Sequence, residues 1–407
     1  MKHADLARFE GSLSERAKLV PPGPAPAAQL GQRPALFDFG GGRPDPGSFP
    51  YAGLLEATRQ VFDREGPEAL TYGALPGYQG LKELICWKLR HFEQAEVTPD
   101  EIFVTNGSSQ AFGIIVDALI DPGDDVIVEA PSFSGSLAIL RKHGAILHGV
   151  PIDRDGLRTD LLADTLHSLA VNGRRAKLIY TIDTFQNPAG PSLSLERRHE
   201  LLRLAQEHGA FVVEDDAYGE IRFSGEVLPS LYALDDAGIV LRTGTLSKIL
   251  GAGLRLGWVT APPEFMTLLM SLKQDWGTNP FVSRVATYYL REHLEEHVRT
   301  LVGVYRAKRD AMLAGLTEGL GESASWNTPE GGFFIWLRLP AGTDLARLNA
   351  LAAEARVSFA GGPGFYADGI GPNGIAKEEI RLAFSYAALD VIPEGTARLC
   401  AAIRAAR

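Results

Sequence analysis

The sequence has only two cysteines, Cys86 and Cys400, which stand far apart and outside any CxxC or Cys/His spacing. We therefore expect neither a disulfide framework nor a metal site. Basic residues are also in deficit, with 40 Lys and Arg against 50 Asp and Glu. The resulting net charge of -10 argues against nucleic acid as a partner, because such binding needs basic surface to replace phosphate counterions.

Long apolar runs are missing too, and no stretch is long enough to span a bilayer. The first twenty residues lack the apolar segment of a secretion signal. We therefore expect no membrane contact and a cytoplasmic location. With 45% hydrophobic and 22% charged residues over 407 positions, the chain has the composition of a globular protein of two or three domains.

Short apolar runs alternate with helical stretches from about residue 51, which predicts an α/β fold. The runs are rich in Val and Ile and mostly lack strict alternation, as is typical of a mostly parallel sheet covered on both faces. The seven expected strands of this sheet are 101–105, 124–131, 144–151, 176–183, 210–216, 238–244 and 254–262.

The pattern changes after about Phe281, where a long helical region leads into further strand and helix signals. This predicts a second, smaller α+β domain. The expected division is an N-terminal arm and small-domain segment at 1–50, a large domain at 51–290, and a C-terminal small domain at 291–407. The arm is expected to be extended because 20–34 is rich in Pro and Ala.

Polar residues follow several of the expected strands, where ligands bind in open α/β sheets. Gly107, Ser108 and Ser109 open a helix with free N–H groups and hydroxyls that would suit an anion, although this turn taken alone favours simple capping of the helix by Asn106 or Ser108. Glu214, Asp215 and Asp216 end another strand, where three adjacent carboxylates need a cation, a metal or solvent nearby.

A lysine, Lys248, lies in the apolar stretch TLSKILGAGLRLGW, between hydroxyls at Thr245 and Ser247 and the cation Arg255. Arg381 lies within the apolar run EIRLAFSYA, where a guanidinium is costly unless it meets an anion. Together these residues predict the groups that a bound ligand should carry. These groups are a phosphate, a cationic nitrogen that faces Asp, a carbonyl that faces Lys and a second anion that faces Arg. Pyridoxal phosphate with an amino-acid substrate fits all four.

Five motifs in register carry a resemblance to a known family. They are TYGALPGYQGLKELI, FQNPAG, VEDDAY, TLSKILGAGLRLGW and IRLAFSY. The chain resembles the fold-type I, class I/II aminotransferases, and most closely the branch with 2-aminoadipate aminotransferases and the effector domains of MocR-type regulators. The resemblance implies an enzyme that moves an amino group between an L-amino acid and a 2-oxo acid.

The resemblance also implies a role for each matched residue. Lys248 would bind the cofactor covalently and act as general acid and base, and Asp215 would keep the pyridine nitrogen protonated. Together with Tyr218 these are the expected catalytic residues. The other implied cofactor contacts are Tyr218 and Asn187 at the 3-hydroxyl, Phe133 on the ring, and Ser108, Ser109, Thr245, Ser247 and Arg255 at the phosphate.

For the substrate, the resemblance implies that Arg381 binds the α-carboxylate, with Asn187 close by. Gly41 and Gly42 would lie against the substrate side chain. Tyr72 would reach the phosphate bound by a second subunit, so a homodimer with shared sites is expected.

Four features depart from the family pattern. Asp183 stands where proline is usual, Ala189 where threonine is usual, and Arg43 where an apolar residue is common. The stretch 275–284 also differs from the sequence usual in the 2-aminoadipate branch. We therefore expect Arg43 to help select a substrate with a distal anionic or polar group. The departures also leave open an enzyme with the same cofactor diverted to elimination, cyclisation or oxidation. A ligand-sensing regulator and a nicotinamide oxidoreductase are disfavoured, the first because few residues precede the motifs and the second because no GxGxxG is present.

Overall fold

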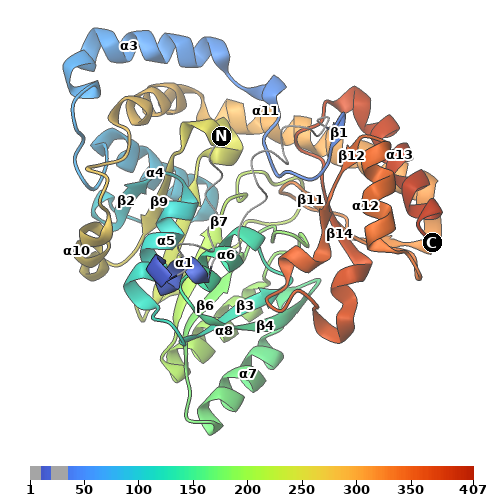
Figure 1. Ribbon diagram of the computed structural model, residues 1–407. Helices are drawn as coiled ribbons and strands as arrows, with labels where there is room; N and C mark the ends of the chain where they lie inside the picture. Colours follow the sequence, from blue (N-terminus) through green and yellow to red (C-terminus); the bar gives the residue numbers. More distant parts are fainter. Residues whose placement is uncertain (1–10, 20–34) are drawn as a thin grey trace.

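The computed structural model of the chain describes residues 11–19 and 35–407 (Figure 1). Much of the arm predicted for the N-terminus lies outside these residues. The described part has a large sheet of eight strands in the order β2-β9-β8-β7-β6-β3-β4-β5. The strands are β2 (Ile102–Thr105), β3 (Asp125–Ala130), β4 (Ile146–Asp153), β5 (Gly156–Leu157), β6 (Ala176–Thr181), β7 (Phe211–Asp216), β8 (Val240–Thr245) and β9 (Gly257–Thr260).

The large sheet is mostly parallel, as the sequence predicts. Strands β4, β3, β6, β7 and β8 run in the same direction, and β9 runs antiparallel to both of its neighbours. All seven predicted strands are present. The eighth, β5, is a two-residue strand that pairs antiparallel with β4 at the edge. It is too short for a periodicity argument to detect.

Helices cover both faces of this sheet, which explains why its strands are apolar on both sides. Val126 and Val128 of β3 face α5 (Ser108–Leu119), α6 (Ser134–Lys142) and α10 (Pro263–Leu272). Ile127 points the other way, toward α7 (Thr159–Val171) and α8 (Leu195–His208). Successive side chains alternate between these two packed layers.

The C-terminal part forms a smaller sheet in the order β10-β11-β14-β13, drawn in orange and red in Figure 1. Its elements are β10 (Ser325–Trp326), β11 (Phe334–Arg338), β13 (Ala360–Gly361), β14 (Glu379–Ala383), α12 (Leu345–Glu354) and α13 (Ile392–Ala405). The N-terminal strand β1 (Phe37–Asp38) pairs with β12 (Val357–Ser358), so this early segment lies with the C-terminal part.

A long helix, α11 (Pro280–Leu320), joins the two parts and contacts α3 (Tyr51–Ala69), α4 (Gln79–Glu93) and α13. It runs unbroken past residue 290, and the domain boundaries proposed from the sequence stay predictions. The remaining helices are the short α1 (Glu15–Lys18) and α9 (Leu231–Leu234). Among the described residues, no helix combines the length and the apolar character needed to cross a membrane.

Candidate active site

A pocket of about 290 Å³ lies at the carboxyl ends of the parallel strands, between the large sheet and β11 and β14. Thirteen of the predicted site residues line it: Gly42, Arg43, Ser108, Ser109, Phe133, Asn187, Asp215, Tyr218, Thr245, Ser247, Lys248, Arg255 and Arg381. Gly41 and Tyr72 are not among its lining residues. The lining residues that the sequence analysis missed are Ile182, Ala217, Ala252 and Phe334.

Lys248 reaches this pocket from η4 (Ser247–Gly251), a π-helical turn that follows β8 directly. Its amine donates to the carbonyl oxygen of Gly42 at 2.9 Å and lies 5.5 Å from the ring centre of Tyr218. Burial is the largest of the effects that lower the pKa of Lys248 to about 8. The charges of Arg381 and Arg255 lower this pKa further, and the charge of Asp215 raises it. A lysine of this kind is available as a nucleophile near neutral pH.

The pleat of β7 separates the three consecutive carboxylates. Asp215 points into the pocket layer, while Glu214 and Asp216 point to the opposite face and meet Arg242 of β8. The Arg242 guanidinium is 2.8 Å from Asp216, and Glu214 also accepts backbone N–H groups. The cation that this acidic triplet requires is therefore a residue of the neighbouring strand.

Asp215 is 8% exposed and accepts two hydrogen bonds from hydroxyl groups. Tyr180 donates to Oδ2 at 2.6 Å, and Thr243 donates to Oδ1 at 2.8 Å. Burial raises the pKa of Asp215 above its usual value, although these hydrogen bonds and the charge of Lys248 oppose that rise. A buried carboxylate of this kind is stabilised by a cation in the pocket.

The other end of the pocket is built for an anion. Helix α5 begins there without any side-chain cap, which argues against the simple capping interpretation of this turn. Gly107 has φ +86°, and a Cβ at this position would lie 2.3 Å from Nη2 of Arg255. The guanidinium of Arg255 donates to the carbonyls of Ala252 and Asn106, and no carboxylate pairs with it among the described residues.

Hydroxyl groups complete this anion site. Thr245 donates within the protein, to Leu256 O at 2.9 Å or to Ser247 Oγ at 2.8 Å. When Thr245 donates to Ser247, the Ser247 hydroxyl keeps its own proton for a ligand. Ser108 and Ser109 lie at the first turn of α5. The uncapped helix, the arginine and the hydroxyls form a donor set that fits a phosphate group.

Arg381 lies on β14 and is 7% exposed. It donates to Asn187 Oδ1 at 2.8 Å and to the carbonyl of Gly40 at 2.7 Å, but its Nε has no partner. Burial lowers the pKa of Arg381 to about 10. A buried guanidinium that meets only neutral acceptors is a receptor for a carboxylate.

Arg43 lies at the mouth of the pocket, with its side chain 52% exposed. It forms an ion pair with Asp38 and stacks on Tyr386, 3.8 Å from the ring centre. The pKa of Asp38 is below its usual value. Burial raises it, but hydrogen bonds from Ser358 and Gly40 and the charge of Arg43 together outweigh that effect. This ion pair weakens the argument that Arg43 is a receptor for an anionic substrate side chain.

The buried carboxyl of Asp183 does not reach the pocket. It is 1% exposed and pairs with Arg198 of α8, itself buried. The second departure, Asp275 in the stretch 275–284, accepts from Asn106 and Gln110 beside the anion site. Neither residue lines the pocket.

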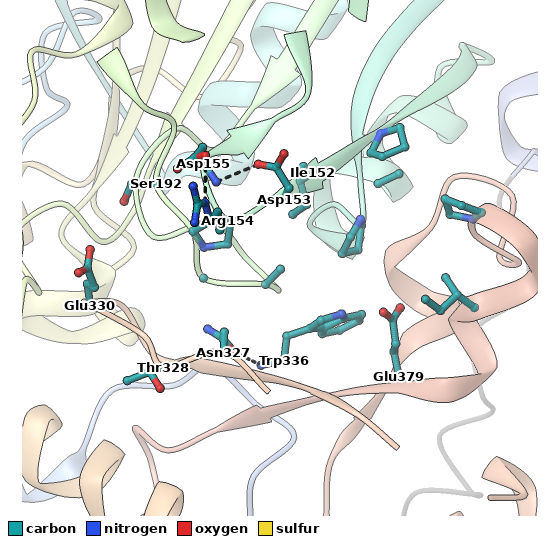
Figure 2. Close-up of a pocket in the computed structure, with 18 of the residues that line it drawn as sticks. Ile152, Asp153, Arg154, Asp155, Ser192, Asn327, Thr328, Glu330, Trp336 and Glu379 are labelled. Carbon is teal, nitrogen blue, oxygen red and sulfur yellow. Dashed lines mark hydrogen bonds and ion pairs between the residues drawn. The ribbon is translucent and has the colours of Figure 1, made fainter. Parts of the chain in front are cut away.

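A second and larger cleft, of about 920 Å³, lies beyond the turn that contains Ala189 and Gly190 (Figure 2). One wall comes from the end of β4, with Ile152 and Asp153, and the other from β11 and β14, with Trp336 and Glu379. This cleft contains no lysine and none of the residues around Lys248. The predicted cofactor and substrate residues that line a pocket are therefore gathered in the smaller one.

Comparisons with known proteins find similar chains over nearly the whole length of this one. A family model described as aminotransferase class I and II matches residues 40–398. Aromatic-amino-acid aminotransferase 1 of Thermococcus litoralis is 35% identical over 372 residues, covering 91% of this chain and 88% of that protein. The 2-aminoadipate transaminase of Thermus thermophilus is 34% identical over 383 residues, covering 92% of each. A kynurenine aminotransferase of Pyrococcus horikoshii, solved with PMP, has a TM-score of 0.90, is 34% identical and matches over 98% of each chain.

The lowered pKa of Lys248 predicts how the apoprotein takes up pyridoxal phosphate. The rate constant of uptake, followed by absorbance, should rise with pH to an inflection near 8, because the neutral amine is the reactive form. Arg381→Leu should move this inflection to higher pH, because a cation that lowers the pKa has been removed. An inflection near 10.5, the ordinary lysine value, would contradict this account of the site.

Proposed function

The chain belongs to the class I and II aminotransferases and is a pyridoxal-phosphate-dependent aminotransferase of fold type I; we propose that it prefers L-amino acids with aromatic or apolar side chains as amino donors. One observation carries the proposed chemistry, and the ion pair between Arg43 and Asp38 carries the substrate preference. The pocket holds Lys248, an inward carboxylate at Asp215 and two separate anion receptors at Arg255 and Arg381 within about 290 Å³.

We propose that these residues divide the work as follows. Pyridoxal phosphate, when bound, supplies an electron-withdrawing ring that stabilises negative charge at the substrate α-carbon. Arg255 and the start of α5 would hold its phosphate, and Asp215 would keep a proton on the ring nitrogen. Arg381 would orient the substrate by its carboxylate. The amine of Lys248, poised near neutral pH, would then move the α-proton.

The substrate preference follows from how the mouth of the pocket is charged. Phe334 and Ile182 line the pocket with apolar surface, and the charge of Arg43 at its mouth is compensated by Asp38. An acidic side chain would have to compete with Asp38 for the Arg43 guanidinium. Among the relatives, one is named for aromatic amino acids and another for 2-aminoadipate. The Asp38–Arg43 pair favours the first of these substrate classes.

The reaction is tested with holoenzyme and a single amino acid, without any oxo acid. Transamination should release one equivalent of 2-oxo acid per site and then stop, with no ammonia and no oxygen consumed. Lys248→Ala should lower turnover at least roughly a thousandfold and remove the visible absorbance of the protein-bound cofactor. The exposed Lys142→Ala is the matched control. Continued turnover with ammonia release would instead indicate elimination or oxidation.

The substrate preference is tested by comparing kcat/KM for phenylalanine and 2-aminoadipate. The wild type should favour phenylalanine. Asp38→Asn should raise the relative value for 2-aminoadipate by about tenfold, because it frees the Arg43 charge while keeping a similar shape. Arg43→Leu should leave phenylalanine turnover unchanged. If Arg43→Leu removes activity on acidic donors while Asp38→Asn has no effect, Arg43 binds the acidic side chain and our proposal is wrong.

We also propose that the chain forms a homodimer with shared sites, in the cytoplasm. Support comes from large apolar side chains that are exposed around α3 and the loop after it. Helix α3 lies at one edge of the molecule (Figure 1). Leu55 is 72% exposed. Tyr72 is 89% exposed and does not line the active-site pocket of its own subunit. Apolar surface of this kind on a folded chain is typical of a protein interface. The other exposed members are Tyr51, Phe62, Leu70 and Trp276.

Two substitutions separate assembly from cofactor binding. Leu55→Glu should shift the protein to monomer in light scattering, because a charge would be buried at the interface. Tyr72→Phe should keep the dimer and weaken pyridoxal phosphate binding by about tenfold, because one hydrogen bond to the phosphate is lost. Tyr51→Phe, at a similarly exposed tyrosine, should change neither. A monomeric wild type, or a Tyr72→Phe protein with unchanged affinity, would refute this assembly.

A further inference from the structure

Asp215 receives a hydrogen bond from the strand on each side of it. On β8, Thr243 is its direct cross-strand partner and donates to Oδ1 at 2.8 Å. On β6, Tyr180 pairs with Val213, two residues before Asp215 on the same face of β7, and its hydroxyl donates to Oδ2 at 2.6 Å. Each carboxylate oxygen therefore accepts one hydroxyl and keeps capacity for a further donor from the pocket.

The Tyr180 hydroxyl is itself held in place. Ser136 of α6 donates to it at 2.9 Å, and the ring packs on Phe112 with 4.9 Å between ring centres. Tyr180 and Thr243 are 0% exposed and Ser136 is 3% exposed, so water does not compete for these bonds. The chain from Ser136 through Tyr180 to Asp215 runs in one direction, with each hydroxyl donating to the next oxygen.

We propose that Tyr180 and Thr243 are positioning residues that hold Asp215 ionised and aimed at the cofactor, with Ser136 orienting Tyr180. The proposal rests on the proposed function, in which Asp215 faces the ring nitrogen. It assigns to three hydroxyl residues a part in tuning the cofactor, although none of them lines the pocket.

The physical reason lies in the competition for one proton between the ring nitrogen and Asp215. Burial pushes a carboxylate toward its neutral form, which would draw the proton away from the nitrogen. Hydrogen bonds donated to the carboxylate stabilise its charged form and leave the proton on the ring. Burial and the charge of Asp215 raise the pKa of Tyr180 well above its usual value, so its phenol remains a donor throughout the working pH range.

The test uses holoenzyme reconstituted with pyridoxal phosphate labelled with ¹⁵N at the ring nitrogen. Tyr180→Phe and Thr243→Val should each move the ¹⁵N resonance toward the value of an unprotonated ring. Each should also lower kcat, by roughly tenfold to a hundredfold for Tyr180→Phe, with the KM for the amino donor within about threefold because Arg381 is untouched. Ser136→Ala should give a smaller change in the same direction.

The matched control is Tyr232→Phe, which removes a similar hydrogen bond from a tyrosine to a carboxylate, at 2.7 Å from Glu101, away from the pocket. It should leave the resonance and kcat unchanged. Ser136→Ala tests the chain of bonds that ends in Tyr180, and Thr243→Val tests the separate bond to Oδ1 of Asp215, so the question is decided even if Tyr180→Phe does not fold.

Asp215→Asn distinguishes failure of this inference from failure of the proposed function. If Asp215→Asn moves the ¹⁵N resonance but the hydroxyl variants do not, the positioning role is refuted and the proposed function stands. If Asp215→Asn leaves the resonance unchanged, Asp215 does not face the nitrogen, and both the assigned role of Asp215 and this inference are wrong.

Discussion

The pleat of β7 is the constraint on which the site depends. Successive residues of a strand face opposite sides, so Asp215 enters the pocket layer while its neighbours Glu214 and Asp216 enter the other layer. On that far side Arg242 compensates them, within a buried ionic cluster. A shift of one residue in register would send two carboxylates into the pocket and leave Arg242 against one, which is why a packed sheet is needed to present a single charge.

Positive charge dominates the rest of the pocket. Lys248, Arg255 and Arg381 converge on it, and Asp215 is the carboxylate that lines it with them. Burial of these cations is unfavourable without anions, so the free-energy cost of folding the site is recovered when a doubly anionic ligand set binds. Burial is the main cause of the lowered pKa of Lys248, and the charges of Arg381 and Arg255 lower it further. The two arginines thus contribute both to the affinity for anions and to the reactivity of the lysine.

Much of this could be read from the sequence, because it depends on local pattern. The seven main strands follow from runs of Val and Ile. Pocket residues such as Ser108, Asp215 and Lys248 follow from polar side chains placed after strands, whereas Phe133 and Gly42 follow only from the family resemblance. The sequence does not show which residues meet across strands. The pairing of Thr243 and Tyr180 with Asp215 depends on register, and the engagement of Arg43 by Asp38 depends on the path of the glycine segment between them. For the contacts of Thr243 and Tyr180 with Asp215, the signal available in the sequence was a hydroxyl side chain within an apolar strand.

Lys248 and Arg381 each donate to a main-chain carbonyl, of Gly42 and Gly40 respectively, and Arg381 also donates to the side chain of Asn187. No amino-acid substitution removes a carbonyl oxygen, so mutation can reach the two main-chain contacts only by moving the backbone. Residues at the mouth, such as Arg43 and Tyr386, have no such protection. Substitutions at the mouth can therefore change which substrate side chain is accepted, while Lys248 and Arg381 keep their main-chain contacts. A scaffold of this kind is well suited to divergence in substrate specificity.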